Sequence, residues 1–248
     1  MVPKALAVTK DQFLGGKLSI QQPSQGHRSG HDAVLLAASI PENAIELCEL
    51  GSGVGVASLC AAFRLGHARI SGIEINPDHF RLAVDNAKGN QLAARVQFLC
   101  GDIYEKPLEL KAAQFDYVFF NPPFYTTDSV QALGDGAKAQ AHQMREEHLD
   151  KWFKYAAYLL RAKGGLSVIH RADAIDILLP VIKRRFGGLK ILPIYSRDGQ
   201  SANRVIITAR RDSKAVSEIL PPFYLQDAAG APSEAAEAIL RAGAALAL

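Results

Sequence analysis

The sequence predicts an α/β fold, in which helices cover both faces of a mainly parallel sheet. The first observation behind this prediction is composition: 48% of the 248 residues are hydrophobic and 21% are charged. Those shares are ordinary for a globular protein and exclude a disordered, collagen-like or disulfide-stapled chain. The second is an alternation of short apolar strand segments with helical segments from residue 44 onward, which is typical of a parallel sheet. We expect one main domain, residues 41–248, preceded by an extension, residues 1–40.

The extension is expected to contain a hairpin and a helix. Residues 13–20 are predicted to form two short strands around Gly15-Gly16, because glycine adopts the positive φ values that tight hairpin turns need. A polar loop, residues 22–30, follows. Residues 32–40 have helical character, and Pro41 ends that helix.

The first half of the main domain is predicted to alternate strands and helices regularly. Pro77 begins one helix at its first turn, where the missing N–H of proline costs nothing. The expected strands are residues 44–50, 69–75, 96–100 and 115–120, and the expected helices are residues 56–65 and 77–88.

The second half is expected to begin with a loop of small and polar residues and to close the sheet. Pro180 should kink or interrupt one of its helices. Its last two strands are joined without a helix, so they should pair antiparallel at one edge of the sheet. We expect a loop at 125–141, helices at 149–160, 174–186 and 233–246, and strands at 165–170, 189–194 and 204–209.

Cysteine usage and hydropathy exclude several classes of protein. Cys48, Cys60 and Cys100 form no C-x-x-C pair and no Cys/His cluster, which argues against a metal site. A sparse, odd number of cysteines suits a reducing compartment. Residues 1–12 lack the apolar core of a secretory signal, and no apolar run reaches the roughly 18 residues of a membrane span. We therefore expect a cytoplasmic protein without metal or membrane partners.

Positive charge is concentrated in residues 183–214. The formal net charge of the whole chain is only +3, whereas this segment holds nine lysines and arginines against Asp198 and Asp212. A local basic patch attracts phosphates even when the whole protein is nearly neutral. A solvated face of the fold would show the same pattern, so both explanations stand at this point.

The end of the first core strand carries a glycine-rich loop, Glu49-Leu50-Gly51-Ser52-Gly53-Val54-Gly55. In parallel sheets ligands bind at the carboxyl ends of the strands. Glycines let the chain turn sharply and let a ligand approach the backbone, and the N-terminus of the following helix offers free N–H groups. The dinucleotide fingerprint G-x-G-x-x-G is not met, because Val56 stands where its third glycine is required.

The next two strands end in acidic residues that suit a nucleoside. Glu74, followed by Ile75, can accept hydrogen bonds from both ribose hydroxyls. Asp102 can accept the exocyclic amine of an adenine, with Ile103 against the face of the ring. A helix-capping role would explain each acid separately.

The fourth strand ends in the most specific pattern of the chain, Asn121-Pro122-Pro123-Phe124. The two prolines restrict the backbone, and the first also holds Asn121 in an extended conformation. The Asn121 carboxamide oxygen and the carbonyls that follow are thereby held in place as acceptors, with an aromatic ring just beyond them. This arrangement suits a flat group that bears an NH2.

Taken together, these strand ends resemble those of the class I S-adenosylmethionine-dependent methyltransferases that methylate amines. The segments Gln22-Pro23 and 27–36, with the strand at Arg204 and the final helix, are similar to the bacterial tRNA (valine) adenine-N6-methyltransferase family. The resemblance implies a Rossmann-like, seven-stranded sheet and S-adenosylmethionine as cofactor. Phe124 is a departure, because many relatives have tyrosine there. The cofactor-binding residues that we expect are Arg28, Gly30, Asp32, Glu49, Gly51, Ser52, Gly53, Gly55, Glu74, Ile75, Asp102, Ile103 and Asn121.

The resemblance also implies a reaction. Asn121, Pro122, Pro123 and Phe124 are the expected catalytic residues. The Asn121 oxygen and the Pro122 carbonyl would accept the two protons of an adenine N6 amine and stabilise the positive charge that develops there. Phe124 would stack on the flipped base, and residues 183–214 would contact tRNA phosphates.

Besides an enzyme that uses a nucleotide other than S-adenosylmethionine, which Val56 disfavours, three other functions remain open at this point. A protein glutamine-N5 methyltransferase uses the same strand end, since a glutamine amide presents a similar NH2, but such enzymes carry a larger helical domain before the core. A DNA adenine methyltransferase and a non-catalytic nucleic-acid-binding module with a vestigial cofactor site are the others. His142, His148 and His170 receive no role.

Overall fold

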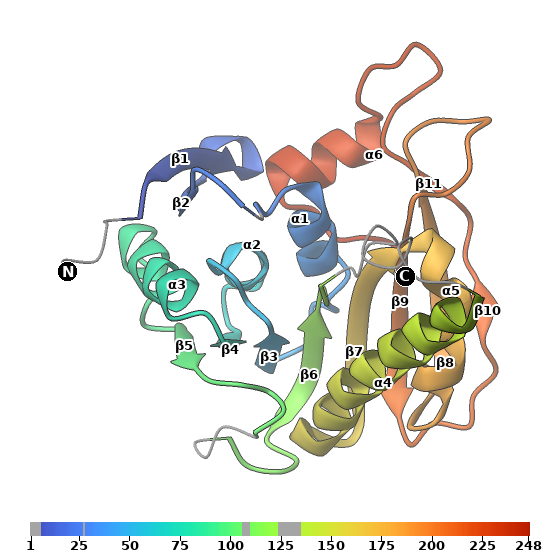
Figure 1. The fold of residues 1–248 in the computed structure, drawn as a ribbon. Helices are drawn as coiled ribbons and strands as arrows, with labels where there is room; N and C mark the ends of the chain where they lie inside the picture. The colour runs from blue at the N-terminus through green and yellow to red at the C-terminus, as the bar shows by residue number, and fades with distance from the viewer. Residues whose placement is uncertain (1–5, 27, 106–109, 124–134) are drawn as a thin grey trace.

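A mainly parallel sheet forms the centre of the molecule, as expected. The computed structural model describes residues 6–26, 28–105, 110–123 and 135–248, without the side chains of residues 135–142. The strand order of the described sheet is β10-β8-β9-β7-β6-β3-β4-β5, and β11 also pairs with β8 (Figure 1). The elements that build it are β3 (Glu46–Leu50), α2 (Val56–Arg64), β4 (Arg69–Glu74), α3 (Pro77–Gly89), β5 (Val96–Cys100), β6 (Phe115–Phe120), α4 (Asp135–Leu159), β7 (Leu160–Arg171), α5 (Ile175–Lys183), β8 (Phe186–Tyr195) and β9 (Arg204–Arg211).

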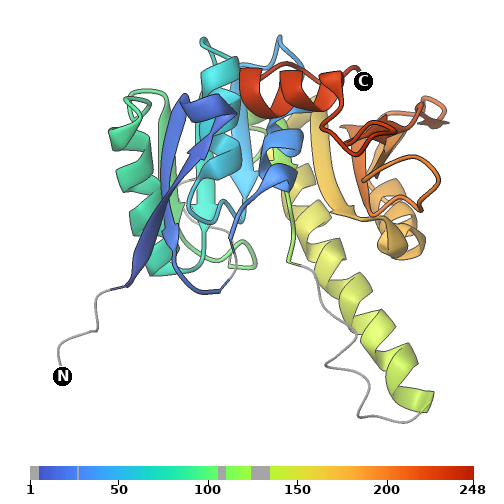
Figure 2. The same ribbon diagram turned by 90° about the horizontal axis from the view of Figure 1, so that it is seen from above.

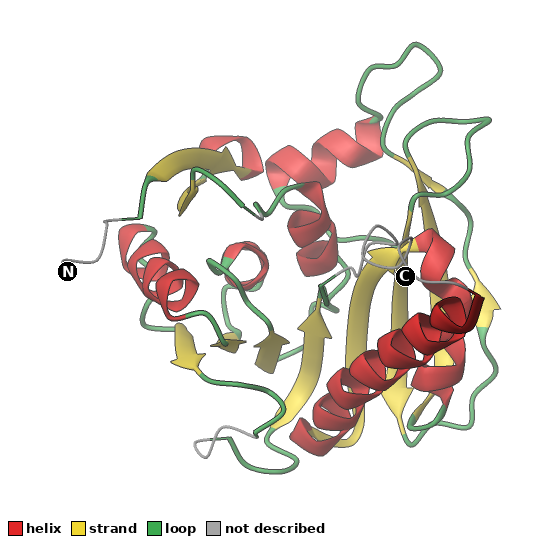
Figure 3. Ribbon diagram, viewed as in Figure 1, coloured by secondary structure: helices red, strands yellow, loops and turns green. Residues whose placement is uncertain are grey.

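Helices cover both faces of this sheet (Figure 3). Two successive residues of β6 pack on opposite faces of the sheet, because Phe119 belongs to one apolar cluster and Phe120 to the other. The first cluster includes α2, α3 and α1 (His31–Ala38). The second includes α4 and α5. Side chains of a strand point alternately to the two faces, so a buried sheet of this kind needs apolar residues at nearly every position.

The extension shares its core with the sheet. Strands β1 (Val8–Phe13) and β2 (Leu18–Pro23) form the expected antiparallel hairpin, which is longer than the sequence indicated. Two asparagines hold β2: Asn86 of α3 bonds the backbone of Gln21, and Asn90, which caps the end of α3, bonds that of Ser19. The hairpin is thus attached to a helix rather than to the main sheet.

The expected antiparallel pair of strands is confirmed, with an addition. β9 pairs antiparallel with both β7 and β8. Beyond β8 lie two strands of two residues each, β10 (Glu218–Ile219) and β11 (Phe223–Tyr224), which the sequence did not suggest. The seven longer strands of this sheet match the expected number.

Several predicted element boundaries were wrong; β7, for example, begins at Leu160 rather than at residue 165. Of the loop expected at 125–141, residues 125–134 lie outside the described residues, and the last part is wrong, because α4 already begins at Asp135. The first turns of α4 project from the rest of the molecule (Figure 2). Their sequence therefore lacks the apolar repeat by which a packed helix is recognised. α5 continues through Pro180 and ends earlier, at Lys183. The final helix consists of α6 (Glu234–Glu237) and a π-helical turn, Ala238–Ala242, and ends at Gly243, whose φ is 77°.

Candidate active site

The register of the central strands brings four predicted strand ends together. Leu50, the last residue of β3, is opposite Ile73 of β4 and Phe120 of β6. Glu74, the last residue of β4, is opposite Cys100 of β5. The residues that follow these strands therefore leave the same edge of the sheet side by side. The glycine loop, Glu74, Asp102 and Asn121 meet there, as the sequence predicted.

Aromatic side chains pack against two of the three glycines in the loop. A methyl group on Gly51 would lie 2.6 Å from the Trp152 ring, and one on Gly55 would lie 2.7 Å from Phe98. Both glycines have positive φ, so a side chain would be strained as well as crowded. Gly53 differs, because nothing lies within 4 Å of the position of its missing Cβ. The loop is therefore packed at both ends and open in its middle, where a ligand can approach the backbone.

Glu49 lies buried beneath this loop, with 4% of its surface exposed. One carboxylate oxygen accepts the backbone N–H of Ser58 at 2.9 Å and also the Ser58 hydroxyl. Burial raises the pKa of Glu49 to about 8; the bonds from Ser58 oppose that rise, and the charge of Glu74 adds to it. A cationic group placed nearby would favour the ionised carboxylate.

Glu74 bonds the glycine loop through one carboxylate oxygen and the start of α3 through the other. One accepts the Gly53 N–H at 2.7 Å, and the other accepts the Asn76 N–H at 2.8 Å. A carboxylate has about four acceptor sites, so each oxygen can still accept a hydroxyl group. Ile75 follows with 62% of its surface exposed.

The loop after β5 turns tightly at Asp102. A carboxylate oxygen of Asp102 accepts the Tyr104 N–H at 2.8 Å, and its carbonyl accepts the Glu105 N–H. The Gly101 N–H donates to the Glu74 carbonyl at 2.9 Å, which continues the pairing of β4 and β5 past the strand ends. Ile103 is buried. Asp102 therefore lies beside Glu74.

Like Ser52 of the glycine loop, Asn121 carries a buried polar atom without a hydrogen-bond partner among the described residues. In Asn121 this atom is the side-chain oxygen. Pro122, which follows it, is buried, whereas Pro123 is exposed. Phe124 lies outside the described residues. A buried acceptor without a donor costs free energy, so the Asn121 oxygen is prepared for a donor from a ligand.

The start of α1 and the segment before it are bonded to β1 and β9. Arg28 pairs with Asp11 and donates to Thr9, both on β1. Asp32 accepts from Arg204 of β9 at 2.7 Å. Gly30 has open space at the position of its missing Cβ. The expected contacts of Arg28, Gly30 and Asp32 with a cofactor remain predictions, and both charged side chains have partners without one.

The basic segment 183–214 lies partly at the edge of the sheet formed by the carboxyl ends of the parallel strands and partly at the opposite edge, formed by their amino ends. β8 runs parallel to β7, and β9 runs antiparallel to both. Arg197 and Arg204 therefore lie at the edge that carries the strand ends, whereas Lys183 and Lys214 lie at the other edge. Several of the cations also have acidic partners, namely Arg184 and Arg185 with Asp150, Lys190 with Glu218, Arg204 with Asp32, and Arg211 with Asp212. The segment does not form one continuous patch.

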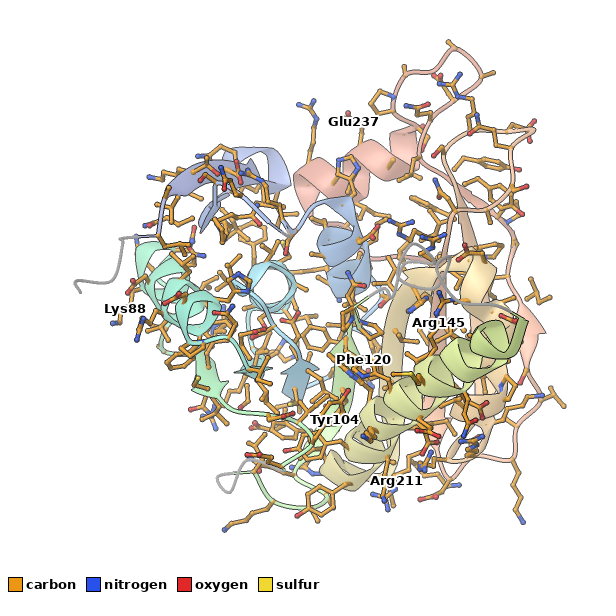
Figure 4. The ribbon with its side chains drawn as sticks, viewed as in Figure 1. Lys88, Tyr104, Phe120, Arg145, Arg211 and Glu237 are labelled. Carbon is orange, nitrogen blue, oxygen red and sulfur yellow. The ribbon has the colours of Figure 1, made fainter. Side chains whose placement is uncertain are left out.

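One aromatic cluster beside the site was missed by the sequence analysis. Trp152 packs against Gly51 and lies 5.5 Å from Phe120, measured between ring centroids. Its indole N–H donates to His148, which also contacts the Tyr104 hydroxyl. Tyr104 and Phe120 lie close to the course of α4 (Figure 4). A single tryptophan in a predicted helix was the available signal.

His142 and His170, which were also left without a role, show no evidence for one. Burial lowers the pKa of His170 to about 4, so this residue is neutral at physiological pH. The side chain of His142 lies outside the described residues. Across the part of the chain that can be described, no three His, Cys, Asp or Glu residues are grouped as metal ligands. None of the helices searched there is both long and apolar enough to cross a membrane.

Known proteins are similar to this chain over most of its length. Residues 31–191 match the family model described as "Methyltransferase small domain". The chain is 30% identical over 182 residues to a tRNA1(Val) (adenine(37)-N6)-methyltransferase of Actinobacillus pleuropneumoniae serotype 7, and the match covers 71% of this chain and 74% of that relative. An enzyme of the same name from Porphyromonas gingivalis is 28% identical, with 83% of each chain covered. A second Porphyromonas gingivalis relative is 31% identical, with 68% of each chain covered.

Solved structures share the fold. A predicted O-methyltransferase from Agrobacterium tumefaciens superposes with a TM-score of 0.73 at 24% identity, covering 88% of this chain and 99% of the other. TYW2 of P. horikoshii, solved in complex with MeSAdo, superposes with a TM-score of 0.54 at 13% identity, covering 83% and 72%. At these identities the likeness concerns the fold alone.

Proposed function

Because the chain belongs to the methyltransferase small domain family, and to the family of the tRNA1(Val) (adenine(37)-N6)-methyltransferases, we propose that it methylates the N6 amine of an adenine near the anticodon of a tRNA. The cofactor is S-adenosylmethionine. The reaction takes place at the strand ends described above. The buried, unpartnered oxygen of Asn121 is the observation that carries this proposal.

The residues at the strand ends fit S-adenosylmethionine. When bound, this cofactor supplies a methyl group made electrophilic by the positive sulfonium. The open backbone at Gly53 leaves room for a ligand beside Glu74, whose oxygens would take the ribose hydroxyls. Asp102 would accept the adenine amine of the cofactor. The buried Glu49 would become ionised beside its ammonium group.

Asn121 would bind the amine that is methylated. The nitrogen lone pair of an adenine amine is delocalised into the ring, which makes it a poor nucleophile. Acceptors at the Asn121 oxygen and the Pro122 carbonyl would hold both N–H groups and would stabilise the positive charge that forms on nitrogen. The acceptors are in place before the reaction, so little reorganisation is needed. No strong base is required, because the proton leaves after methyl transfer.

The tRNA would lie over the same edge of the sheet. Arg197 can contact phosphates there, and Arg204 can bind a phosphate while it also pairs with Asp32. Such contacts position the RNA without reading its sequence. The target base would be flipped out of its stack and held on Phe124. A tRNA substrate also favours the expected location in the cytoplasm.

Substitution of Asn121 by alanine tests this proposal. We expect Asn121→Ala to lose at least 100-fold in methyl transfer to bulk tRNA, while its affinity for S-adenosylhomocysteine, measured by calorimetry, changes less than fivefold. Labelled cofactor would be offered separately with tRNA, rRNA, DNA and protein. Wild-type turnover by Asn121→Ala, or labelling of a substrate other than tRNA, would contradict the proposal.

A further inference from the structure

Trp152 packs against two parts of the active site, the glycine loop and the end of β6. Its ring lies against Gly51 so closely that a Cβ there would be 2.6 Å away. The same ring lies 5.5 Å from Phe120, the residue directly before Asn121. The indole is 6% exposed. The position of the Trp152 ring therefore affects both the glycine loop and the start of the Asn-Pro-Pro turn.

His148 orients this ring. The Trp152 indole N–H donates to Nε2 of His148 at 3.0 Å. The Tyr104 hydroxyl contacts Nδ1 and lies 3.1 Å from Nε2. In the tautomer in which Nε2 accepts from the indole, the neutral imidazole carries its proton on Nδ1 and can donate it to this hydroxyl. A neutral His148 can satisfy both neighbours. A doubly protonated imidazole would present an N–H to the indole N–H, and the bond between them would be lost.

Tyr104 connects this pair to the cofactor end of the site. Its backbone N–H donates to Asp102, the expected ligand of the adenine amine. The ring of Tyr104 also lies under the ammonium of Lys151, 4.9 Å from ring centroid to nitrogen. Hydrogen bonds and packing thus form a continuous path from the Asp102 turn through Tyr104, His148 and Trp152 to the glycine loop.

We propose that His148 is a positioning residue of the cofactor site, which holds the Trp152 ring against Gly51 and ties α4 to the turn at Asp102. This inference rests on the proposed function, because it concerns the affinity of the same site for S-adenosylmethionine. His148 contacts Trp152 and Tyr104. It acts on the loop through Trp152 and on the Asp102 turn through Tyr104.

The electrostatic surroundings agree with a neutral His148. Burial, and then the positive charge of Lys151, lower the pKa of this imidazole. Among the described residues, the Tyr104 hydroxyl from the β5–β6 loop contacts this imidazole, and the charge of Lys151 from α4 acts on it. Both are compatible with an uncharged ring at physiological pH.

Trp152 makes a direct test possible, because it is the one tryptophan of the chain. Its fluorescence would be recorded in the intact protein with and without S-adenosylhomocysteine, for the wild type, His148→Ala and His148→Gln. Glutamine can accept from the indole and donate to Tyr104, so it should replace the imidazole. Glu147→Ala, an exposed change on the same helix, is the matched control.

We expect His148→Ala to weaken S-adenosylhomocysteine binding about tenfold, in line with the loss of one buried hydrogen bond. Its KM for S-adenosylmethionine should rise by a similar factor, with a smaller change in kcat. His148→Gln should restore most of the affinity and the wild-type emission of Trp152. On acidification, wild-type emission should fall as His148 becomes charged, since a protonated imidazole quenches indole, and His148→Gln should show no such step.

Other outcomes would decide against the inference. Wild-type affinity in His148→Ala would overturn it, as would equal losses in the alanine and glutamine variants. If His148→Ala does not unfold cooperatively, the glutamine variant and the pH titration of Trp152 in the wild type decide. Failure of the wild type to bind S-adenosylhomocysteine would instead contradict the proposed function.

Discussion

Asn86 of α3 bonds Gln21 of β2 as a neighbouring strand would. Its side-chain oxygen accepts the Gln21 N–H at 2.7 Å, and its NH2 donates to the Gln21 carbonyl at 3.0 Å. The same NH2 donates to the carbonyl of Val54 in the glycine loop at 3.0 Å. One buried carboxamide therefore joins the N-terminal hairpin, a helix of the main domain and the cofactor loop.

Removing this carboxamide should destabilise the protein. Asn86→Ala leaves the Gln21 N–H and two carbonyls without their partner, and we expect the free energy of unfolding in urea to fall by about 2–3 kcal/mol. Lys88→Ala, at an exposed position of the same helix (Figure 4), should change it by less than about 0.5 kcal/mol. Equal losses in the two variants would show that the Asn86 bonds contribute little.

Two glycines of the loop should respond differently to substitution by alanine. Gly51→Ala would place a Cβ against the Trp152 ring, so thermal stability should fall strongly. Gly53→Ala meets no atom within 4 Å, so only its φ of 55° is unfavourable, at about 1–2 kcal/mol. Gly53→Ala should therefore fold, yet bind S-adenosylhomocysteine at least tenfold more weakly because the methyl group occupies ligand space. If Gly53→Ala binds S-adenosylhomocysteine with wild-type affinity, the ligand does not lie against Gly53.

Glu49 should make stability depend on pH. Its pKa is about 8 in the folded protein, against an ordinary value of 4.5, so the folded state holds a proton that the unfolded state releases. The stabilisation is present below the ordinary value and decreases as the pH rises toward 8. Urea unfolding at pH 5.5, 7 and 8.5 should show this decrease in the wild type and not in Glu49→Gln. Glu42→Gln, at an exposed position, should retain it.

Cofactor binding should have the opposite dependence on pH. If the ammonium group of the cofactor lies beside Glu49, the carboxyl loses its proton when the complex forms. Affinity for S-adenosylhomocysteine should then rise between pH 6 and 8, and calorimetry in buffers of different ionisation enthalpy should detect the released proton. A pH-independent affinity would separate Glu49 from the ligand.

The division of the basic segment predicts unequal effects on RNA binding. Arg197 lies at the edge that carries the active site, and Lys214 follows β9 at the other edge. Arg197→Ala should weaken tRNA binding and lower the slope of log K against log salt by about one. Lys214→Ala should change neither. Equal effects of the two variants would favour a tRNA that wraps around both edges.

The local pattern of the sequence was enough for most of the fold and for the strand ends that meet at one edge of the sheet. Apolar runs ending in glycine or Asn-Pro-Pro predicted the central strands, and the residues after them predicted a cofactor and an amine. Strand ends could be assigned because parallel strands present their carboxyl ends at one edge. The class I methyltransferase fold expected from these ends is confirmed by the superposition on a solved structure.

Only the tertiary structure decided which distant residues meet. The first turns of α4 are polar and project from the body, so no apolar repeat revealed them. The contacts of Trp152 with Gly51, of Asn86 with Gln21 and of Asp32 with Arg204 join residues far apart in the chain. Such contacts depend on strand order and helix crossing, which burial of the whole core selects and which no local pattern encodes.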